Sequence, residues 1–159
     1  MAKILVTGGA GYIGSHTCIQ LLSAGHDVVV LDNLSNSSVE SLARVQALAA
    51  KKLDFVEGDI LDQQILDQIF QHHSIDAVIH FAGLKAVGES QKEPLKYFEN
   101  NISGSISLVK AMERAQVFKL VFSSSATVYD EANISPLNET MPTGMPSNNY
   151  GYTKLIVEQ

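Results

Sequence analysis

The feature that most constrains the fold is an apolar run leading directly into a glycine-rich segment and then a stretch of helical period. Lys3–Thr7 forms the apolar run, Gly8–Gly14 holds the glycines, and Tyr12–Ala24 carries apolar residues at helical spacing. A second apolar run follows at Asp27–Asp32. This order predicts a strand, a tight loop, a helix and a second strand, the unit from which parallel sheets covered by helices are built.

The same alternation continues along the chain. We expect further strands at Phe55-Val56, Ala77–His80 and Leu120–Phe122, and helices over Val39–Ala50, Leu61–His72 and Pro94–Gln116. Loops are expected at Phe81–Ser90 and at residues 130–149, and a last helix begins near Tyr150. The sequence therefore predicts an α/β fold, a doubly wound parallel sheet of the Rossmann type with strand order 3-2-1-4-5.

Length and composition narrow the classes of function. A chain of 159 residues is about one domain, and its net charge of −6 disfavours a nucleic-acid or anionic-membrane partner. No apolar stretch approaches the roughly 20 residues that span a bilayer. With one cysteine, Cys18, an internal disulfide is impossible and a cysteine metal cluster is disfavoured, so we expect no metal site and a cytoplasmic protein. We expect residues 1–159 to form one domain, cut at Gln159 within its last helix, before a further domain.

The glycine segment has the setting of a dinucleotide-binding loop. Glycines allow a tight turn and a close approach of the backbone to a pyrophosphate, and the following helix offers it unpaired N–H groups. Asp32 ends the second predicted strand, where a carboxylate can accept hydrogen bonds from a ribose. It would repel a 2′-phosphate, and the first arginine beyond it is Arg44, so NAD is favoured over NADP. The alternative is a plain turn with Asp32 as a cap.

Three side chains near the end of the chain have the chemistry of a proton-transfer site. Tyr150 and Lys154 are four residues apart, one turn on the same face of a helix. A phenol is a poor base at neutral pH, but a nearby ammonium and an oxidised nicotinamide favour the phenolate. Ser125 closes a serine run at a strand end, where ligands of such sheets bind. The alternatives are an exposed amphipathic pair, Tyr152 as the phenol, and serines that only form a turn.

Together these motifs resemble the extended short-chain dehydrogenases/reductases, and within them the UDP-glucose 4-epimerases. The glycine loop and the pair Tyr150 and Lys154 are shared by the whole superfamily. The stretches Ala82–Ser90 and Ser123–Tyr129 are closer to the epimerases. The residues that carry the resemblance are Val6–His16, Asp32–Leu34, Glu57–Ile60, His80–Ser90, Ser123–Tyr129, Tyr150 and Lys154. One departure is Asp130, where relatives usually have glycine.

The resemblance implies the role of each site residue. Tyr150 would be the general base, Lys154 the cation beside it and a ribose ligand, and Ser125 the hydroxyl that orients the substrate. Tyr150 and Ser125 would contact a UDP-sugar. The implied NAD ligands are Gly8, Gly11, Tyr12, Ile13, Gly14, Asp32, Asn33, Leu34, Ser35, Asn36, Ser37, Asp59, Ile60, Phe81, Ala82, Gly83, Leu84, Lys85, Asn100, Ser125, Tyr150 and Lys154.

The resemblance also implies the reaction, which is interconversion of UDP-glucose and UDP-galactose through a 4-keto sugar, in a homodimeric enzyme of galactose metabolism. Two alternatives stay open. The chain could be an NAD-binding module without catalysis, or part of another NAD-dependent enzyme acting on nucleotide sugars. Among the latter, 4,6-dehydratases carry an acidic pair after the strand-end hydroxyl. Ala126 and Thr127 occupy those positions here and cannot protonate a leaving hydroxyl.

Overall fold

A computed structural model describes residues 1–159 and divides them into two compact units. The first unit comprises Met1–Ala82 and Ser107–Ser123. The second comprises Gly83–Ile106 and Ser124–Gln159.

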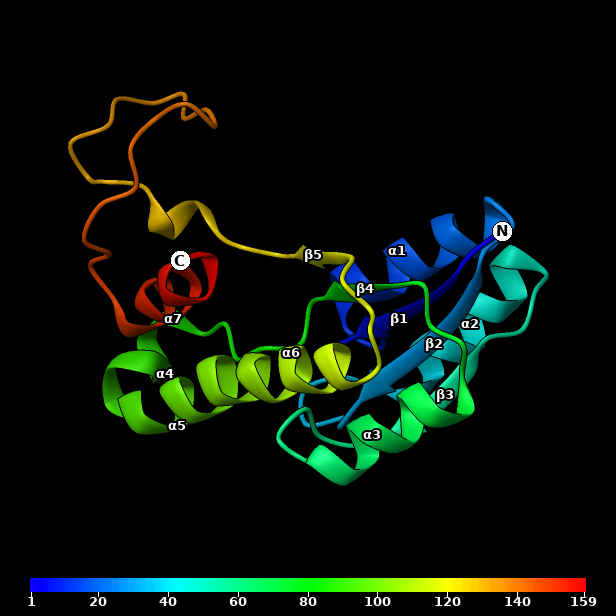
Figure 1. The fold of residues 1–159 in the computed structure, drawn as a ribbon. Coiled ribbons are helices and arrows are strands. Elements are labelled where there is room, and N and C mark those ends of the chain that lie inside the picture. Colours follow the sequence, from blue (N-terminus) through cyan, green and yellow to red (C-terminus); the bar gives the residue numbers. More distant parts are fainter. The chain divides into compact units, whose positions relative to one another are not determined.

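The first unit is built on a five-stranded parallel sheet in the order β3-β2-β1-β4-β5 (Figure 1). This order confirms the doubly wound sheet expected from the alternating pattern. The strands are β1 (Lys3–Thr7), β2 (Asp27–Asp32), β3 (Asp54–Glu57), β4 (Ala77–His80) and β5 (Leu120–Phe122). Because Thr7 pairs with both Leu31 and His80, the carboxyl ends of the three central strands lie level with one another.

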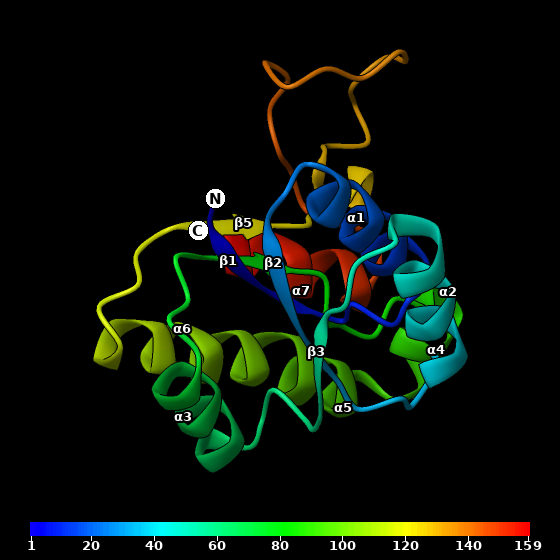
Figure 2. The same cartoon turned by 90° about the vertical axis from the view of Figure 1, so that its right-hand side faces the viewer.

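Helices cover both faces of this sheet, as Figure 2 shows. The helices of the unit are α1 (Tyr12–Ser23), α2 (Val39–Ala49), α3 (Gln63–His72) and the Ser107–Arg114 part of α6 (Gly104–Arg114). Side chains alternate along each strand, so Leu5 packs with α3 and α6 while Val6 packs with α1 and α2. Two apolar layers result, and each fully buried aliphatic side chain contributes about 1.5–3 kcal/mol to stability.

Side-chain caps set where several helices begin. Asp62 accepts hydrogen bonds from the N–H groups of Gln64 and Ile65, so α3 starts at Gln63 and not at Leu61 as expected. Ser38 caps α2 in the same way, through the N–H of Glu40. The predicted bounds of α1 and α2 were correct to within one residue.

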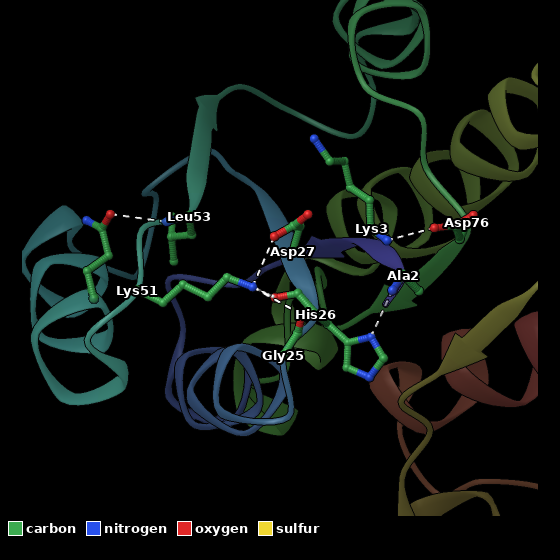
Figure 3. Close-up of polar contacts among 9 residues, drawn as sticks. Ala2, Lys3, Gly25, His26, Asp27, Lys51, Leu53 and Asp76 are labelled. Carbon is green, nitrogen blue, oxygen red and sulfur yellow. Dashed lines mark hydrogen bonds and ion pairs between the residues drawn. The ribbon is translucent and has the colours of Figure 1, made fainter.

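Polar contacts of the backbone occupy the amino-terminal edge of the sheet (Figure 3). Lys51 donates hydrogen bonds to the carbonyl oxygens of Gly25 and His26, at 3.2 and 2.7 Å, just beyond the end of α1. The hydrogen bond from Lys51 also lowers the pKa of the Asp27 carboxyl, 3.0 Å away. Asp76 accepts a hydrogen bond from the N–H of Lys3. The polar groups at this edge are thus bound to other groups of the chain. The glycine loop and Asp32 lie at the opposite edge, where the strands end.

The second unit is mainly helical. Its elements are α4 (Val87–Lys92), α5 (Pro94–Phe98), a π-helical turn η1 (Glu99–Ser103), the first residues of α6, a 3₁₀ turn η2 (Ala126–Val128) and α7 (Asn149–Glu158). Asn148 caps α7 through the N–H of Gly151, which confirms the helix expected near Tyr150. None of the helices of the structure is long and apolar enough to cross a membrane.

Two expectations about this part of the chain were wrong. Phe81–Ser90 is not all loop, because α4 begins at Val87. This short helix has no capping side chain at Ala86 and no apolar period that would reveal it. The helix expected over Pro94–Gln116 is interrupted by the π-turn η1 and ends at Arg114. Pro94 does occupy its first turn, as expected.

Candidate functional site

The glycine loop after β1 is shaped by two close backbone approaches. Gly8 has a φ of +70°, and a Cβ on it would lie 2.6 Å from the backbone nitrogen of Ala82. A Cβ on Gly14 would collide with the carbonyl oxygen of Gly8. Both positions therefore require glycine, for conformational freedom in the first case and for space in both. Gly14 allows the first turn of α1 to pack directly on the loop.

The amino terminus of α1 is left without a side-chain cap. Gly11 is the N-cap residue, and the first turn contains no acidic side chain. Tyr12 and Ile13, the next two residues, are exposed. Backbone N–H groups and the positive end of the helix dipole at such a terminus suit an anion, so this turn can hold a diphosphate.

Asp32 lies at the end of β2 and is buried, with 8% of its surface exposed. One carboxylate oxygen accepts a hydrogen bond from the N–H of Ala10, at 2.9 Å, in the glycine loop. The other accepts from the N–H of Leu34 and the hydroxyl of Ser37, at 3.0 and 2.8 Å. The carboxylate thus holds two loops in place. It accepts three hydrogen bonds, and because a carboxylate has about four acceptor positions, one position remains for a ribose hydroxyl.

The turn after β2 continues this polar arrangement. Asn33 donates a hydrogen bond of 2.8 Å to Asp59, and the N–H of Leu61 donates to the other oxygen of Asp59. Ile60, which lies between Asp59 and Leu61 in the sequence, is buried. Arg44 is exposed and pairs with Glu40 one helical turn away. The segment from Asn33 to Ser38 contains no lysine or arginine, so no cationic side chain of this segment could bind a 2′-phosphate.

Replacing Asp32 is expected to change cofactor binding in a definite direction. Asp32 is predicted to accept a ribose hydroxyl and to repel a 2′-phosphate, so we expect NAD to bind about 10–100-fold more weakly to Asp32→Ala. The preference for NAD over NADP should narrow in the same variant. Calorimetric titration of both nucleotides measures the two effects. Asp32→Asn, which keeps most of the shape, should also narrow the preference. Asp76→Asn at the opposite edge is the control, and a wild-type preference for NADP would contradict the prediction.

The turn after β4 lies against the glycine loop. The N–H of Phe81 donates to the carbonyl oxygen of Thr7, and the N–H of Ala82 points to the Thr7 hydroxyl at 3.4 Å. That hydroxyl also lies 2.6 Å from Nδ1 of His80, and Thr7 and His80 are both buried. The first unit thus brings Gly8–Gly14, Asp32, Asp59 and Phe81-Ala82 to the carboxyl ends of its strands.

In the second unit, α7 carries the predicted base and its cation. Tyr150 is half-buried in the first turn, and Lys154 follows one turn later, with 6% of its surface exposed. Burial lowers the pKa of Lys154 to about 8. A Cβ on Gly83 would lie 3.7 Å from Nζ of Lys154, so the segment after β4 runs past the ammonium. Lys85 is exposed.

The lowered pKa of Lys154 predicts a pH-dependent stability. A lysine of the unfolded chain keeps an ordinary pKa near about 10.4, so between about pH 8 and 10.4 the unfolded chain binds more protons. The free energy of unfolding therefore gains a contribution that rises with pH across this window. We expect Lys154→Met to be more stable than wild type by about 3 kcal/mol below pH ~8, and the difference to shrink towards pH ~10.

Urea unfolding at several pH values measures this difference. The matched control is Lys110→Met, which removes an exposed lysine and should leave the pH dependence of stability as in wild type. A difference between wild type and Lys154→Met that stays constant with pH would contradict the prediction.

A buried amide connects three segments around Lys154. Asn101, in η1, accepts a hydrogen bond from the N–H of Leu84 and donates to its carbonyl oxygen, at 2.8 and 2.9 Å. It also donates to the hydroxyl of Thr153, at 3.0 Å, and this hydroxyl donates to the carbonyl oxygen of Tyr150. Asn100, the predicted ligand, donates to Asn101. Asn101, which the sequence analysis did not single out, therefore organises this region, and the NAD contact expected of Asn100 stays a prediction.

Ser125 begins the turn η2 that follows β5 in sequence. Its hydroxyl oxygen accepts hydrogen bonds from the N–H and the hydroxyl of Thr127, at 3.3 and 3.0 Å. A Cβ on Gly151 would lie 3.0 Å from the Thr127 hydroxyl, so η2 packs against the first turn of α7. The Ser124 hydroxyl is buried without a hydrogen-bond partner. The second unit thus places a serine turn beside the helix of Tyr150.

The loop that contains Asp130 has its own arrangement. The N–H of Asp130 donates to Pro142, and the N–H of Gly144 donates to Val128, which joins the two ends of the loop as an antiparallel bridge. A Cβ on Gly144 would collide with the carboxylate of Asp130. The aspartate at this position is therefore accommodated by a glycine across the bridge. No group of three or more His, Cys, Asp or Glu is placed so that it could hold a metal ion.

Comparison with known proteins agrees with this geometry. The model of the "NAD dependent epimerase/dehydratase family" matches residues 4–159. The chain is 58% identical to the UDP-glucose 4-epimerase of Bacillus subtilis over 156 residues, which cover 98% of this chain and 46% of that protein. It is 55% identical to that of Neisseria meningitidis serogroup B, over all of this chain and 47% of the relative. The chain spans about half the length of the curated relatives it matches.

Solved structures give the same result. A UDP-glucose 4-epimerase from Stenotrophomonas maltophila, with bound NAD and formylated UDP-arabinopyranose, matches with a TM-score of 0.95 and 52% identity. That match covers 100% of this chain and 47% of the solved one. The enzyme from Bifidobacterium longum, in complex with NAD+ and UDP, matches with a TM-score of 0.97 and 46% identity, over 99% of this chain and 47% of that one.

Proposed function

This chain belongs to the NAD dependent epimerase/dehydratase family, and we propose that it is the cofactor-binding part of an enzyme that interconverts UDP-glucose and UDP-galactose. The observation that carries the proposal is α7, which presents Tyr150 with the buried Lys154 one turn away. The chain matches only 46% of the length of the Bacillus subtilis protein, and this supports the proposal that it is part of a longer enzyme.

Two features of the first unit support NAD binding. The uncapped start of α1 suits the diphosphate, and Asp32 keeps an acceptor position for the adenosine ribose. The other residues that we propose as ligands follow strand ends or lie around Lys154: Asn33, Leu34, Ser35, Asn36, Ser37, Asp59, Ile60, Phe81, Ala82, Gly83, Leu84, Lys85 and Asn100. When bound, NAD supplies the acceptor and donor of a hydride.

The residues of the chain supply the proton transfers. Tyr150 takes the proton from the 4-hydroxyl of the sugar as the C4 hydrogen leaves as hydride, which gives a 4-keto sugar. The buried ammonium of Lys154 favours the phenolate form of the tyrosine and can bind a ribose hydroxyl. Ser125 holds the sugar oxygen beside the phenol. Return of the hydride to the other face of C4, and of the proton to its oxygen, completes the inversion.

Two observations favour this proposal over the alternatives. Ala126 and Thr127, in η2, offer no acid to protonate a leaving hydroxyl, which disfavours a 4,6-dehydratase. The pairing of Tyr150 with a buried ammonium one helical turn away disfavours an inert NAD-binding module, because binding NAD alone does not require a phenol beside that lysine. Incubation of the longer protein with UDP-galactose tests all three. The proposal expects UDP-glucose, a dehydratase would give a 4-keto-6-deoxy sugar, and a module would give no product.

We also propose that the longer enzyme is a homodimer. Large apolar side chains are exposed on consecutive helices, among them Leu95 on α5 and Ile106 and Val109 on α6. Large apolar side chains that are exposed on a helix can be buried in an interface between protein chains. Light scattering of the longer protein tests this, and a monomer at micromolar concentration would contradict it. The cytoplasmic location expected from the sequence stays a prediction.

A further inference from the structure

The backbone donors at the start of α7 are shared between the helix and a neighbouring element. Asn148 serves two of them, since its side chain accepts from the N–H of Gly151 and its carbonyl oxygen from the N–H of Tyr152. The N–H of Tyr150 itself has a partner outside the helix, the hydroxyl of Ser90 in α4, at 3.1 Å. The predicted base is thus held at its own backbone by a residue 60 positions earlier.

Ser90 is built into this position from both sides. It is fully buried, and its hydroxyl donates to the carbonyl oxygen of Val87, at 2.6 Å, while it accepts from Tyr150. The donation to Val87 orients the hydroxyl, so that an oxygen lone pair is left for the Tyr150 N–H. The side chain of Asn149 donates to the carbonyl oxygen of Ser90, at 3.0 Å, and to the side chain of Gln91. Two consecutive residues of α7 therefore contact Ser90.

The helix that carries Ser90 is itself fixed by a buried phenol. Tyr97, in α5, has no exposed surface, donates to a carboxylate oxygen of Glu89 at 2.7 Å, and accepts from the N–H of Ala86. Burial, together with the Glu89 carboxylate, raises the pKa of Tyr97 to about 12, so the phenol stays a donor at neutral pH. Lys96 binds the other oxygen of Glu89. The start and the middle of α4 are thereby held to α5.

From these contacts we propose that Ser90 is a positioning residue of the epimerase reaction, which sets the place of the Tyr150 phenol by holding the Tyr150 backbone. This inference rests on the proposed function, in which Tyr150 is the base. Ser90 touches neither substrate nor cofactor in this role. A displacement of about 1 Å at a reacting group can lower a rate by about 100-fold, so one misplaced helix start suffices to slow turnover.

The test uses the longer enzyme with three serine variants. We expect Ser90→Ala to lower kcat by about 10–100-fold, with KM for UDP-galactose and the affinity for NAD within about twofold of wild type. Ser90→Thr, which restores a hydroxyl, should recover most of kcat. The control is Ser103→Ala, because Ser103 is a serine of the same unit whose side chain is exposed. It should leave kcat unchanged.

Amide hydrogen exchange at Tyr150 supplies a readout independent of activity. We expect this amide to exchange faster in Ser90→Ala than in wild type and Ser103→Ala, with the thermal midpoint changed by a few degrees at most. A kcat within twofold of wild type in Ser90→Ala, or an unchanged Tyr150 amide, would overturn the inference. If Tyr150→Phe also kept its turnover, the proposed function of Tyr150 would fail as well. If only Ser90→Ala kept it, the failure would concern Ser90 alone.

Discussion

Tyr150→Phe is expected to reduce epimerase turnover of the longer enzyme by about 10²–10⁴-fold, the usual effect of removing a general base. The substitution deletes one oxygen and keeps the ring, so the packing of α7 and the burial of Lys154 should persist. The affinity for NAD should change little, because the glycine loop and Asp32 are untouched. Conversion of UDP-galactose to UDP-glucose and calorimetric binding of NAD measure the two quantities.

The matched control for this prediction is Tyr152→Phe. Tyr152 is also half-buried on α7, but two residues from Tyr150 and therefore on a different face of the helix. We expect its removal to leave turnover within a few-fold of wild type. If Tyr150→Phe kept more than about a tenth of wild-type turnover, Tyr150 would not be the base.

The 159-residue chain alone is expected to show no measurable epimerase activity, at least about 100-fold less than the longer protein. We propose that the remaining part of such proteins binds the nucleotide portion of the substrate. Without that binding, C4 of the sugar is not held against the site, and positioning of this kind can contribute about 7–11 kcal/mol to a reaction barrier. The assay measures UDP-glucose formed from UDP-galactose with NAD present.

A binding measurement separates this result from failure to fold. The chain should show the circular dichroism of an α/β protein and should bind NAD, because the glycine loop, the start of α1 and Asp32 all lie in its first unit. Turnover by the chain within about 100-fold of the longer protein would show that the substrate site lies within residues 1–159, contrary to the proposal.

Most of the sheet could be predicted from the sequence because its strands are short, apolar and separated by strong turn signals. Asp27–Asp32 is the clearest case, since four apolar residues between two acids leave little choice of structure. The same holds for Gly8 and Gly14, where the absence of a side chain is itself the signal of a close approach. Local pattern and tertiary structure agree at these positions, so local reasoning succeeds.

The errors occur where contacts between distant segments decide the structure. The helix α4 has no apolar period, and it is fixed by Tyr97 through Glu89 and Ala86. The π-turn η1 places Asn101 beside Leu84 and Thr153, which are 17 and 52 positions away. A buried serine or asparagine that serves a distant backbone group has no recognisable spacing in sequence. Ser90 and Asn101 could therefore be found only from the structure.

In the proposed reaction, the sugar is inverted by removal and return of the same C4 hydrogen as hydride, with Tyr150 moving only the hydroxyl proton. To test this, the longer protein is incubated with UDP-galactose deuterated at C4, in ordinary water, and the product is examined by mass spectrometry and NMR. We expect UDP-glucose that keeps its deuterium at C4. Loss of that deuterium to the solvent, or a product other than UDP-glucose, would contradict the proposed reaction.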